Sequence, residues 1–316
     1  MKKFLSIFLS ILLLFSFSSC AKNKTESKNN SKKTIVTTIF PFYDFAKNIV
    51  GDKMDVKLLI APGQSAHDFK NNITIADLTI IHKSDIFVYC GGETDSFIEK
   101  SDGFTDRKNS FNIRAMDLVK TYDEKIIEGM QSDHENEEEH KETDEHIWTN
   151  PQNVIKICDE ITKFAKKVDP KNSDFYDKKN NTYSEKLNTL DNKFESMINS
   201  AKRKTFLVGD RFPFRYLAER YSLNYYAAFP GCSSAVDVSL STISFLVNKV
   251  ETEKLPVVFY ADGSTKEVCK QICEKTGAKP LLLHSCHDLT QEEFESGANY
   301  LSIMESNFIN LSEALN

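Results

Sequence analysis

The chain has 316 residues, of which 40% are hydrophobic, so it can bury one large core or two modest ones. Lys and Arg together number 40 against 46 Asp and Glu, which gives a formal net charge of -6. Proteins that bind nucleic acid need a basic surface to displace counterions, so this balance disfavours a nucleic-acid partner.

The N-terminal segment has the features of an export signal. Two lysines precede an apolar run over residues 4–17, which is short for a transmembrane span. Ser19 followed by Cys20 suits lipoprotein processing, in which a diacylglyceryl thioether forms on the cysteine. We therefore expect residues 1–19 to be a signal peptide and residues 20–33, which are almost entirely polar, to be a lipid-anchored flexible tether. A secreted protein with Cys20 in a disulfide is the alternative.

From Thr34 onward, short β-branched runs alternate with helical patterns, and this alternation predicts parallel α/β sheets. In the first half the expected strands lie near residues 35–39, 55–60, 86–90 and 111–114, with helices over 42–50, 75–83 and 95–100. The second half repeats the plan with strands near 205–209, 224–229, 256–260 and 280–284, and helices near 213–222, 239–252, 264–276 and 290–312.

A long polar helix is expected between the two halves. Apolar residues keep an approximate helical spacing between residues 172 and 201, at Phe175, Tyr176, Tyr183, Leu187, Leu190, Phe194 and Met197. The prediction is an α/β fold of two lobes, residues 34–171 and 202–316. Each lobe has a mainly parallel four-stranded sheet flanked by helices, and a long rigid helix over 172–201 joins them.

Four candidate metal ligands fall at or just beyond the ends of predicted strands, where open α/β sheets bind their ligands. His67 lies in the loop after the second strand, and His146 precedes a helix that begins at Pro151. Asp210 follows the strand at 205–209, and His284 ends the last strand. Imidazole and carboxylate groups suit zinc, and donors from both halves would hold one ion between the lobes.

Each candidate also has a structural interpretation. A lone histidine near a strand end is more often a hydrogen-bonded structural residue than a ligand, and we keep that interpretation for His82 within a predicted helix. His287 either supports a ligand or lies on the surface. Asp210 could instead pair with Arg211 or Arg215, which is the commoner fate of such an acid.

An acidic segment from Asp133 to Glu145 forms part of an expected loop over residues 120–145 and contains His134 and His140. It has no apolar residue to anchor it, which is typical of a solvated loop. The two histidines give it a possible accessory role, in which it collects metal weakly and passes it to His146.

Six cysteines follow Cys20. Cys232 and Cys286 each come after a predicted strand of the second half, so a bridge between them is one alternative in an exported protein. Cys269 and Cys273 lie one helical turn apart, a spacing more typical of two small core residues than of a redox pair.

Five sequence segments match a known pattern: TIFPFYDFAKNIVGD, PGQSAHDF, SDIFVYCGGETDSFIEK, DEHIWTNP and the final SGANYLSIMESNFINL. Through them the chain resembles the metal-specific solute-binding lipoproteins of ABC importers over essentially its whole mature length. The resemblance implies two α/β lobes joined by a long helix, with one four-coordinate metal between them. His67 and His146 match the first two histidine ligands of the family.

The second half departs from the family pattern. A third histidine is common in the family near the position where this chain has Gly209 and Asp210, so that ligand is either replaced by Asp210 or missing. An acid is common where His284 stands. We interpret this as an exchange of carboxylate and histidine, which keeps three histidines and one acid and favours zinc over a harder ion such as manganese.

The resemblance implies a receptor, not an enzyme, anchored by lipid on the extracytoplasmic face of the cell membrane. Its expected ligand is transported zinc, its expected partners are an ABC permease and ATPase, and it is expected to be a monomer. The same role for manganese or iron(II) is the alternative. A secreted zinc hydrolase is less favoured because the sequence has no HExxH signature, and an adhesin-like surface protein is a third possibility.

Overall fold

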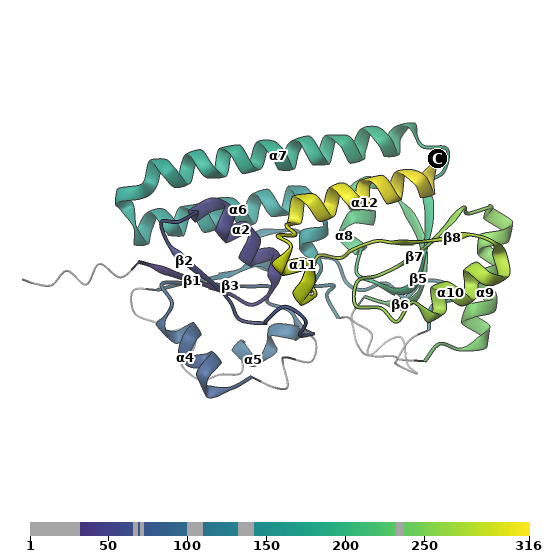
Figure 1. The fold of residues 1–316 in the computed structure, drawn as a ribbon, viewed down its shortest axis with the longest axis horizontal. Coiled ribbons are helices and arrows are strands. Elements are labelled where there is room, and N and C mark those ends of the chain that lie inside the picture. The colour runs from purple at the N-terminus through teal and green to yellow at the C-terminus, as the bar shows by residue number, and fades with distance from the viewer. Residues whose placement is uncertain (1–31, 66–68, 70–72, 100–109, 132–141, 232–236) are drawn as a thin grey trace, which may run out of the picture. The chain divides into compact units, whose positions relative to one another are not determined.

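The computed structural model describes residues 32–65, 69, 73–99, 110–131, 142–231 and 237–316. Residues 33–316 belong to one compact unit, which contains two four-stranded sheets with helices packed against them (Figure 1). Every pairing between neighbouring strands is parallel. The predicted fold class is therefore confirmed.

The first sheet has the strand order β2-β1-β3-β4. Its strands are β1 (Thr34–Thr37), β2 (Asp55–Leu58), β3 (Ile86–Tyr89) and β4 (Phe111–Arg114). Its helices are α2 (Phe40–Val50), α4 (Ile75–Lys83) and α5 (Ser96–Glu99), with 3-10 turns at Glu93–Asp95 and Ala115–Leu118. All four residues of β3 are buried, as expected for an apolar run in the interior of a parallel sheet.

The second sheet repeats this arrangement in the order β6-β5-β7-β8. Its strands are β5 (Thr205–Phe212), β6 (Asn224–Pro230), β7 (Val257–Tyr260) and β8 (Lys279–Leu282). The accompanying helices are α8 (Arg215–Tyr221), α9 (Leu240–Glu253), α10 (Glu267–Thr276), α11 (Gln291–Glu295) and α12 (Tyr300–Leu315).

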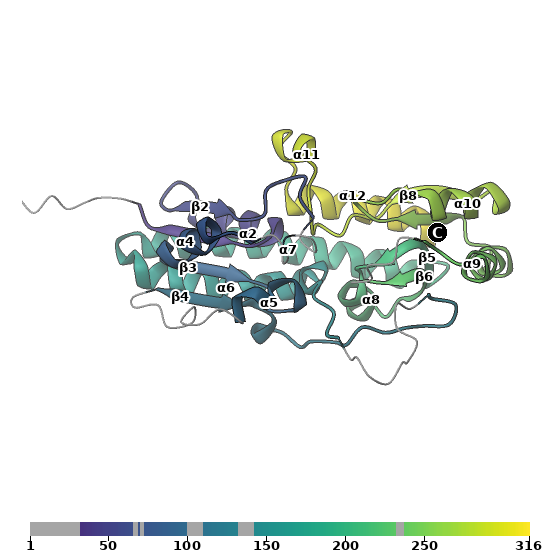
Figure 2. The same ribbon diagram turned by 90° about the horizontal axis from the view of Figure 1, so that it is seen from below.

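Two helices connect the sheets. A 3-10 turn at Ile147–Thr149 leads into α6 (Pro151–Val168), and a second turn at Pro170–Asn172 leads into α7 (Ser173–Ser200). The 28 residues of α7 run alongside α6 and α2 of the first half and α12 of the second (Figures 1 and 2). Of the seven apolar positions expected to face the core, all but Phe175 are buried. A single hydrophobic cluster includes residues from both halves, so the sheets share a core.

The helix predicted over residues 290–312 is wrong in one respect, because the structure has two helices there. The chain turns after α11 at Gly297, whose φ of 81° favours glycine. Asn299 then caps a new helix by accepting a hydrogen bond from the backbone N–H of Ser302. This break turns α12 away from α11 and lets it pack against α7.

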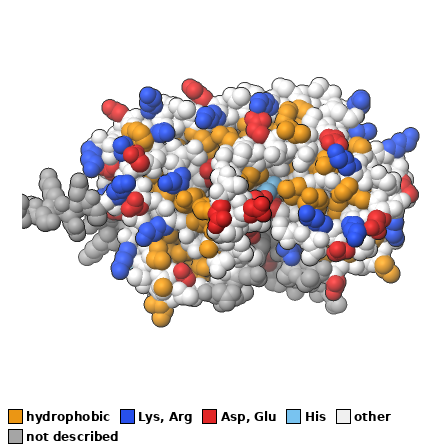
Figure 3. Space-filling view, viewed as in Figure 1, with side chains coloured by type: hydrophobic (Ala, Val, Ile, Leu, Met, Phe, Trp, Pro, Cys, Tyr) orange, Lys and Arg blue, Asp and Glu red, His pale blue; other side chains and the backbone are white. Residues whose placement is uncertain are grey.

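In the face shown in Figure 3, positive and negative side chains are interspersed. The face shows no extended basic stripe of the kind that nucleic-acid binding uses. Among the helices that the structure describes, none is long and apolar enough to cross a membrane.

Candidate metal-binding site

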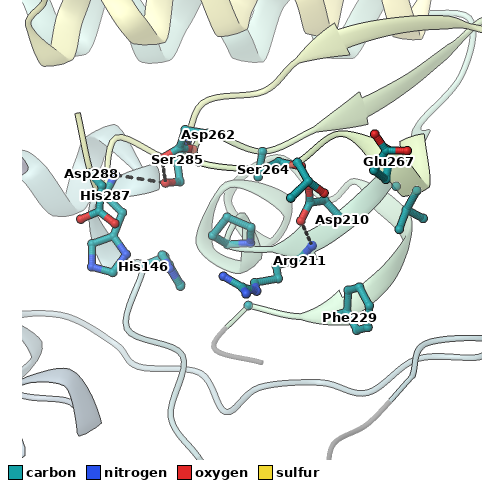
Figure 4. Close-up of a pocket in the computed structure, with 17 residues that line it drawn as sticks. His146, Asp210, Arg211, Phe229, Asp262, Ser264, Glu267, Ser285, His287 and Asp288 are labelled. Atoms are coloured by element: carbon teal, nitrogen blue, oxygen red, sulfur yellow. Dashed lines mark hydrogen bonds between the residues drawn. The ribbon is translucent and has the colours of Figure 1, made fainter. Parts of the chain in front are cut away.

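A pocket of about 150 Å³ lies where the carboxyl ends of β5 and β7 meet a loop from the first half (Figure 4). Its lining includes His146, Asp210, Asp262, Ser285, His287 and Asp288. This is the sheet edge at which open α/β folds bind their ligands. The pocket therefore collects imidazole and carboxylate groups from both halves of the chain.

His146 stands just before α6 and is 1% exposed. Its Nδ1 lies 3.2 Å from Oδ1 of Asp144, and its backbone N–H donates to the same oxygen at 2.8 Å. A carboxylate that binds one ring nitrogen orients the imidazole and leaves Nε2 as the nitrogen that can bind a metal. Burial lowers the pKa of His146, but Asp144, followed by Glu145 and Glu124, outweighs burial and raises it above the usual value.

The last two residues of the acidic segment, Asp144 and Glu145, are buried. The prediction of a solvated loop is therefore wrong for this end of the segment. Asp144 and Glu145 are each 2% exposed. The Asp144 backbone N–H donates to the Tyr122 carbonyl at 2.9 Å, and the Tyr216 hydroxyl donates to the Asp144 carbonyl at 2.7 Å. Asp144 is thus held from two directions while it orients His146. Residues 132–141, including His134 and His140, lie outside the described residues.

His287 enters the pocket from the turn after β8. Its ring centroid lies 5.3 Å from that of His146 and 5.1 Å from that of Trp148. Ser285 fixes the turn, because its backbone N–H and its hydroxyl both donate to the carboxylate of Asp262, and its Oγ accepts from the His287 N–H at 3.0 Å. His287, which the sequence left between two interpretations, is therefore one of the two histidines that line this pocket.

His284 begins the same turn but faces elsewhere. Its Nδ1 accepts a hydrogen bond from the Cys286 N–H at 2.9 Å, and its Nε2 lies 3.6 Å from Oε1 of Glu293 on α11. Cys286, which lies between the two histidines, has a φ of 63°, a conformation that non-glycine residues rarely adopt. Of the two, His287 and not His284 lines the pocket. Cys286 itself is a buried free thiol, and Cys232 lies outside the described residues.

Asp210 lines the pocket from β5, on the side away from His146 and His287 (Figure 4). Its Oδ1 accepts from the backbone N–H of Arg211 at 2.8 Å. Burial raises the pKa of Asp210, partly offset by a hydrogen bond from Ser264. The alternative pairing with Arg215 is not formed, since that guanidinium lies 2.8 Å from Glu219.

The two halves are tied together beside the pocket. The Trp148 indole N–H donates to the Ser285 carbonyl at 2.8 Å, and the Gly63 N–H donates to the Leu289 carbonyl at 2.7 Å. The carbonyl of Trp148 accepts from the Tyr300 hydroxyl at 2.8 Å. The segment that carries His146 and the turn that carries His287 are thus held in register by direct hydrogen bonds.

Within the part of the chain that the structure describes, no three His, Cys, Asp or Glu side chains form a group ready to hold a metal ion. His67 lies outside that part. His82 is exposed on α4 and does not line the pocket. The described residues therefore supply an oriented histidine pair with nearby acids, which is a partial set of zinc donors.

The comparisons with known proteins show the family and the fold. Residues 35–314 match the family described as zinc-uptake complex component A, periplasmic. The zinc-binding lipoprotein AdcA of Streptococcus pneumoniae is 28% identical over 312 residues, which cover 97% of this chain and 60% of that protein. The high-affinity zinc uptake system protein ZnuA of Bacillus subtilis is 27% identical, with 99% of this chain and 98% of that protein covered.

Among solved structures, the Zn(II)-bound ZnuA-like domain of Streptococcus pneumoniae AdcA superposes with a TM-score of 0.74 at 26% identity. The match covers 90% of this chain and 99% of that domain. This chain spans about 60% of the length of the full streptococcal AdcA. Because the family match covers nearly all of the two-sheet unit, the chain belongs to the family of the zinc-uptake complex component A.

Proposed function

We propose that this chain captures a zinc ion in the pocket between His146 and His287 and delivers it to the permease and ATPase of an ABC importer. One observation carries the proposal. Two buried imidazoles from different halves of the chain line one small pocket, with ring centroids 5.3 Å apart. Imidazole and carboxylate are typical zinc donors, and the relatives named for zinc binding and zinc uptake support the same cargo.

The proposed ligands are His67 and His146 from the first half and a histidine and an acid from the second. His287 is favoured over His284 because it lines the same pocket as His146. Asp210 remains the proposed acid. Asp262 also lines the pocket and is the next candidate, although both of its carboxylate oxygens accept hydrogen bonds from Ser285.

The setting of the protein is part of the proposal. Cys20 carries the lipid anchor on the extracytoplasmic face, after removal of residues 1–19, and residues 20–33 serve as the tether. Lobes 34–171 and 202–316, joined by the helix over 172–201, act as a monomeric receptor and not as an enzyme. Manganese or iron(II) in the same pocket is the alternative cargo.

Zinc affinity, measured by competition with a chromogenic chelator, tests the assignment. His146→Ala and His287→Ala should each lower zinc affinity by more than the roughly 10–100-fold that loss of a supporting partner causes. His82→Ala is the matched control, since His82 is exposed on α4. If His284→Ala abolishes binding while His287→Ala does not, His284 is the ligand. If manganese displaces zinc at equal concentration, the cargo assignment is wrong.

A further inference from the structure

Two cysteines on α10 form a pair outside the zinc pocket. Cys269 and Cys273 are one helical turn apart, and their sulfur atoms are separated by 4.0 Å. Both are free thiols; Cys269 is buried, and Cys273 is half-buried. The Cys269 thiol also lies 3.4 Å from the Val258 carbonyl of β7, which fixes its direction.

The pair opens onto a pocket of its own. This pocket of about 520 Å³ is lined by both cysteines together with Tyr260, Lys266, Lys270, Glu274 and Pro280. The ammonium of Lys266 lies 4.7 Å from the centre of the Tyr260 ring. Neither cysteine lines the zinc pocket, and none of the residues that line this second pocket belongs to the zinc pocket's lining. The pair therefore borders a second, separate opening, with Cys273 half-buried and Cys269 fully buried.

The geometry does not suit a disulfide. A disulfide needs sulfurs about 2.05 Å apart and Cβ atoms about 3.8 Å apart. Side chains one turn apart on a helix have Cβ atoms about 5–6 Å apart, so a disulfide here would require α10 to unwind. Two thiolates bound to one tetrahedral metal at about 2.3 Å each are about 3.8 Å apart. The observed 4.0 Å is close to that spacing without any movement of the helix.

We propose that Cys269 and Cys273 form a second metal site, which takes a thiophilic d10 cation such as Cd²⁺ or Cu⁺. Thiolate sulfur is a soft ligand and selects soft cations over Mg²⁺, Ca²⁺ or Mn²⁺. On binding, each S–H bond breaks, each sulfur forms a bond to the metal, and two protons pass to the buffer. No electron is transferred. Water from the open pocket completes the coordination, with Glu274 at its edge.

The surroundings of the pair set the pH dependence of this site. Burial raises the pKa of both thiols, and the neighbouring sulfur raises that of Cys269 further, although Lys266 lowers it in part. Asp210 is the acidic group that also raises the pKa of the Cys269 thiol. Both thiols are thus protonated at neutral pH. Because two protons leave for each cation bound, affinity should rise about 100-fold per pH unit.

The test is a cadmium titration of the reduced, zinc-saturated full chain, followed by the thiolate-to-cadmium charge-transfer band in the near ultraviolet. Wild type should bind one equivalent with release of two protons. Cys273→Ser should lower cadmium affinity by more than the roughly 10–100-fold that loss of a supporting partner causes, because a single thiolate remains. Cys158→Ala is the matched control, since it removes a buried thiol from α6, and it should leave the band unchanged. Cys273 is the primary target because it is half-buried, so its substitution leaves the core intact.

Four outcomes would overturn the proposal. Three are no band in wild type, an unchanged band in Cys273→Ser, and loss of the band in Cys158→Ala; the fourth concerns the zinc pocket. The site stands apart from the proposed zinc function. His146→Ala should lose zinc binding and keep the cadmium band. Loss of the cadmium band in His146→Ala would assign the cation to the zinc pocket and refute the second site.

Discussion

Asp44 is a carboxyl group placed where three helices meet, and its substitution by asparagine should stabilise the protein at neutral pH. It lies on α2, and its Oδ2 accepts hydrogen bonds of 3.3 Å from the Tyr183 hydroxyl on α7 and from the Tyr300 N–H at the start of α12. Burial raises the pKa of Asp44 from 3.8 to about 6, and these two hydrogen bonds offset only part of the effect.

The direction of the effect follows from the two pKa values. Because the folded-state pKa lies above the unfolded one, protonation favours the folded state, and that stability is lost as pH rises through about 6. Each pKa unit corresponds to about 1.4 kcal/mol, so a fully shielded carboxylate would destabilise the fold by about 3 kcal/mol at neutral pH. Asp44 is only partly buried, and solvent screening reduces the expected effect to about 1–2 kcal/mol.

An asparagine side chain at this position would keep an oxygen acceptor for both donors but carry no charge, so Asp44→Asn isolates the electrostatic effect. The assay is urea unfolding of both proteins between about pH 4 and about pH 8. The variant should be more stable at the upper end, and the difference should become small at the lower end, close to the unfolded-state pKa of 3.8. Asp55→Asn, an exposed position on β2, is the control and should change stability little at any pH. A variant less stable than wild type at neutral pH, or a difference independent of pH, would refute the reasoning.

Three further predictions concern the zinc site and the anchor. Trp148→Phe leaves the Ser285 carbonyl without its indole donor, so it should cost about 1–3 kcal/mol in urea unfolding and weaken zinc binding; an unchanged unfolding curve would contradict this. Asp144→Ala should lower zinc affinity roughly 10–100-fold in chelator competition, because His146 loses the carboxylate that orients it, and unchanged affinity would refute that role. Cys20→Ala should release the protein into the medium in cell fractionation, and a variant that stays on the membrane with its N-terminus intact would refute lipid anchoring.

The strands and their order along the chain were predictable because most are short runs of β-branched or aromatic residues that alternate with helical patterns. The run IFVY at β3 is buried on both faces, and a parallel sheet needs that uninterrupted hydrophobicity. The break between α11 and α12 was harder to predict. Apolar residues continue at helical spacing across residues 290–312. The break between the two helices depends on one glycine, Gly297, and on one capping residue, Asn299.

The site was predictable only in part. A histidine just before a helix opened by proline drew attention to His146, but the choice between His284 and His287 depends on the turn between them. Cys286 adopts a positive φ there, a conformation that non-glycine residues rarely take, and of the two histidines beside it His287 lines the pocket. The role of Asp144 was hard to predict because this residue belongs to a run of acidic residues. Its position two residues before His146 is the sequence feature that indicates a supporting carboxylate.

The contacts around the pocket also limit how a bound ion could leave it. A wide hinge opening would have to break the Trp148 and Gly63 hydrogen bonds and separate a hydrophobic core that both halves share. It would also have to bend α7, which packs against helices of both halves over its 28 residues. Movement of the turn over residues 284–289 would also disturb the Trp148 and Gly63 hydrogen bonds, which end on Ser285 and Leu289, but it would leave the shared core and α7 in place. Release by movement of this turn is therefore energetically favoured over separation of the two sheets.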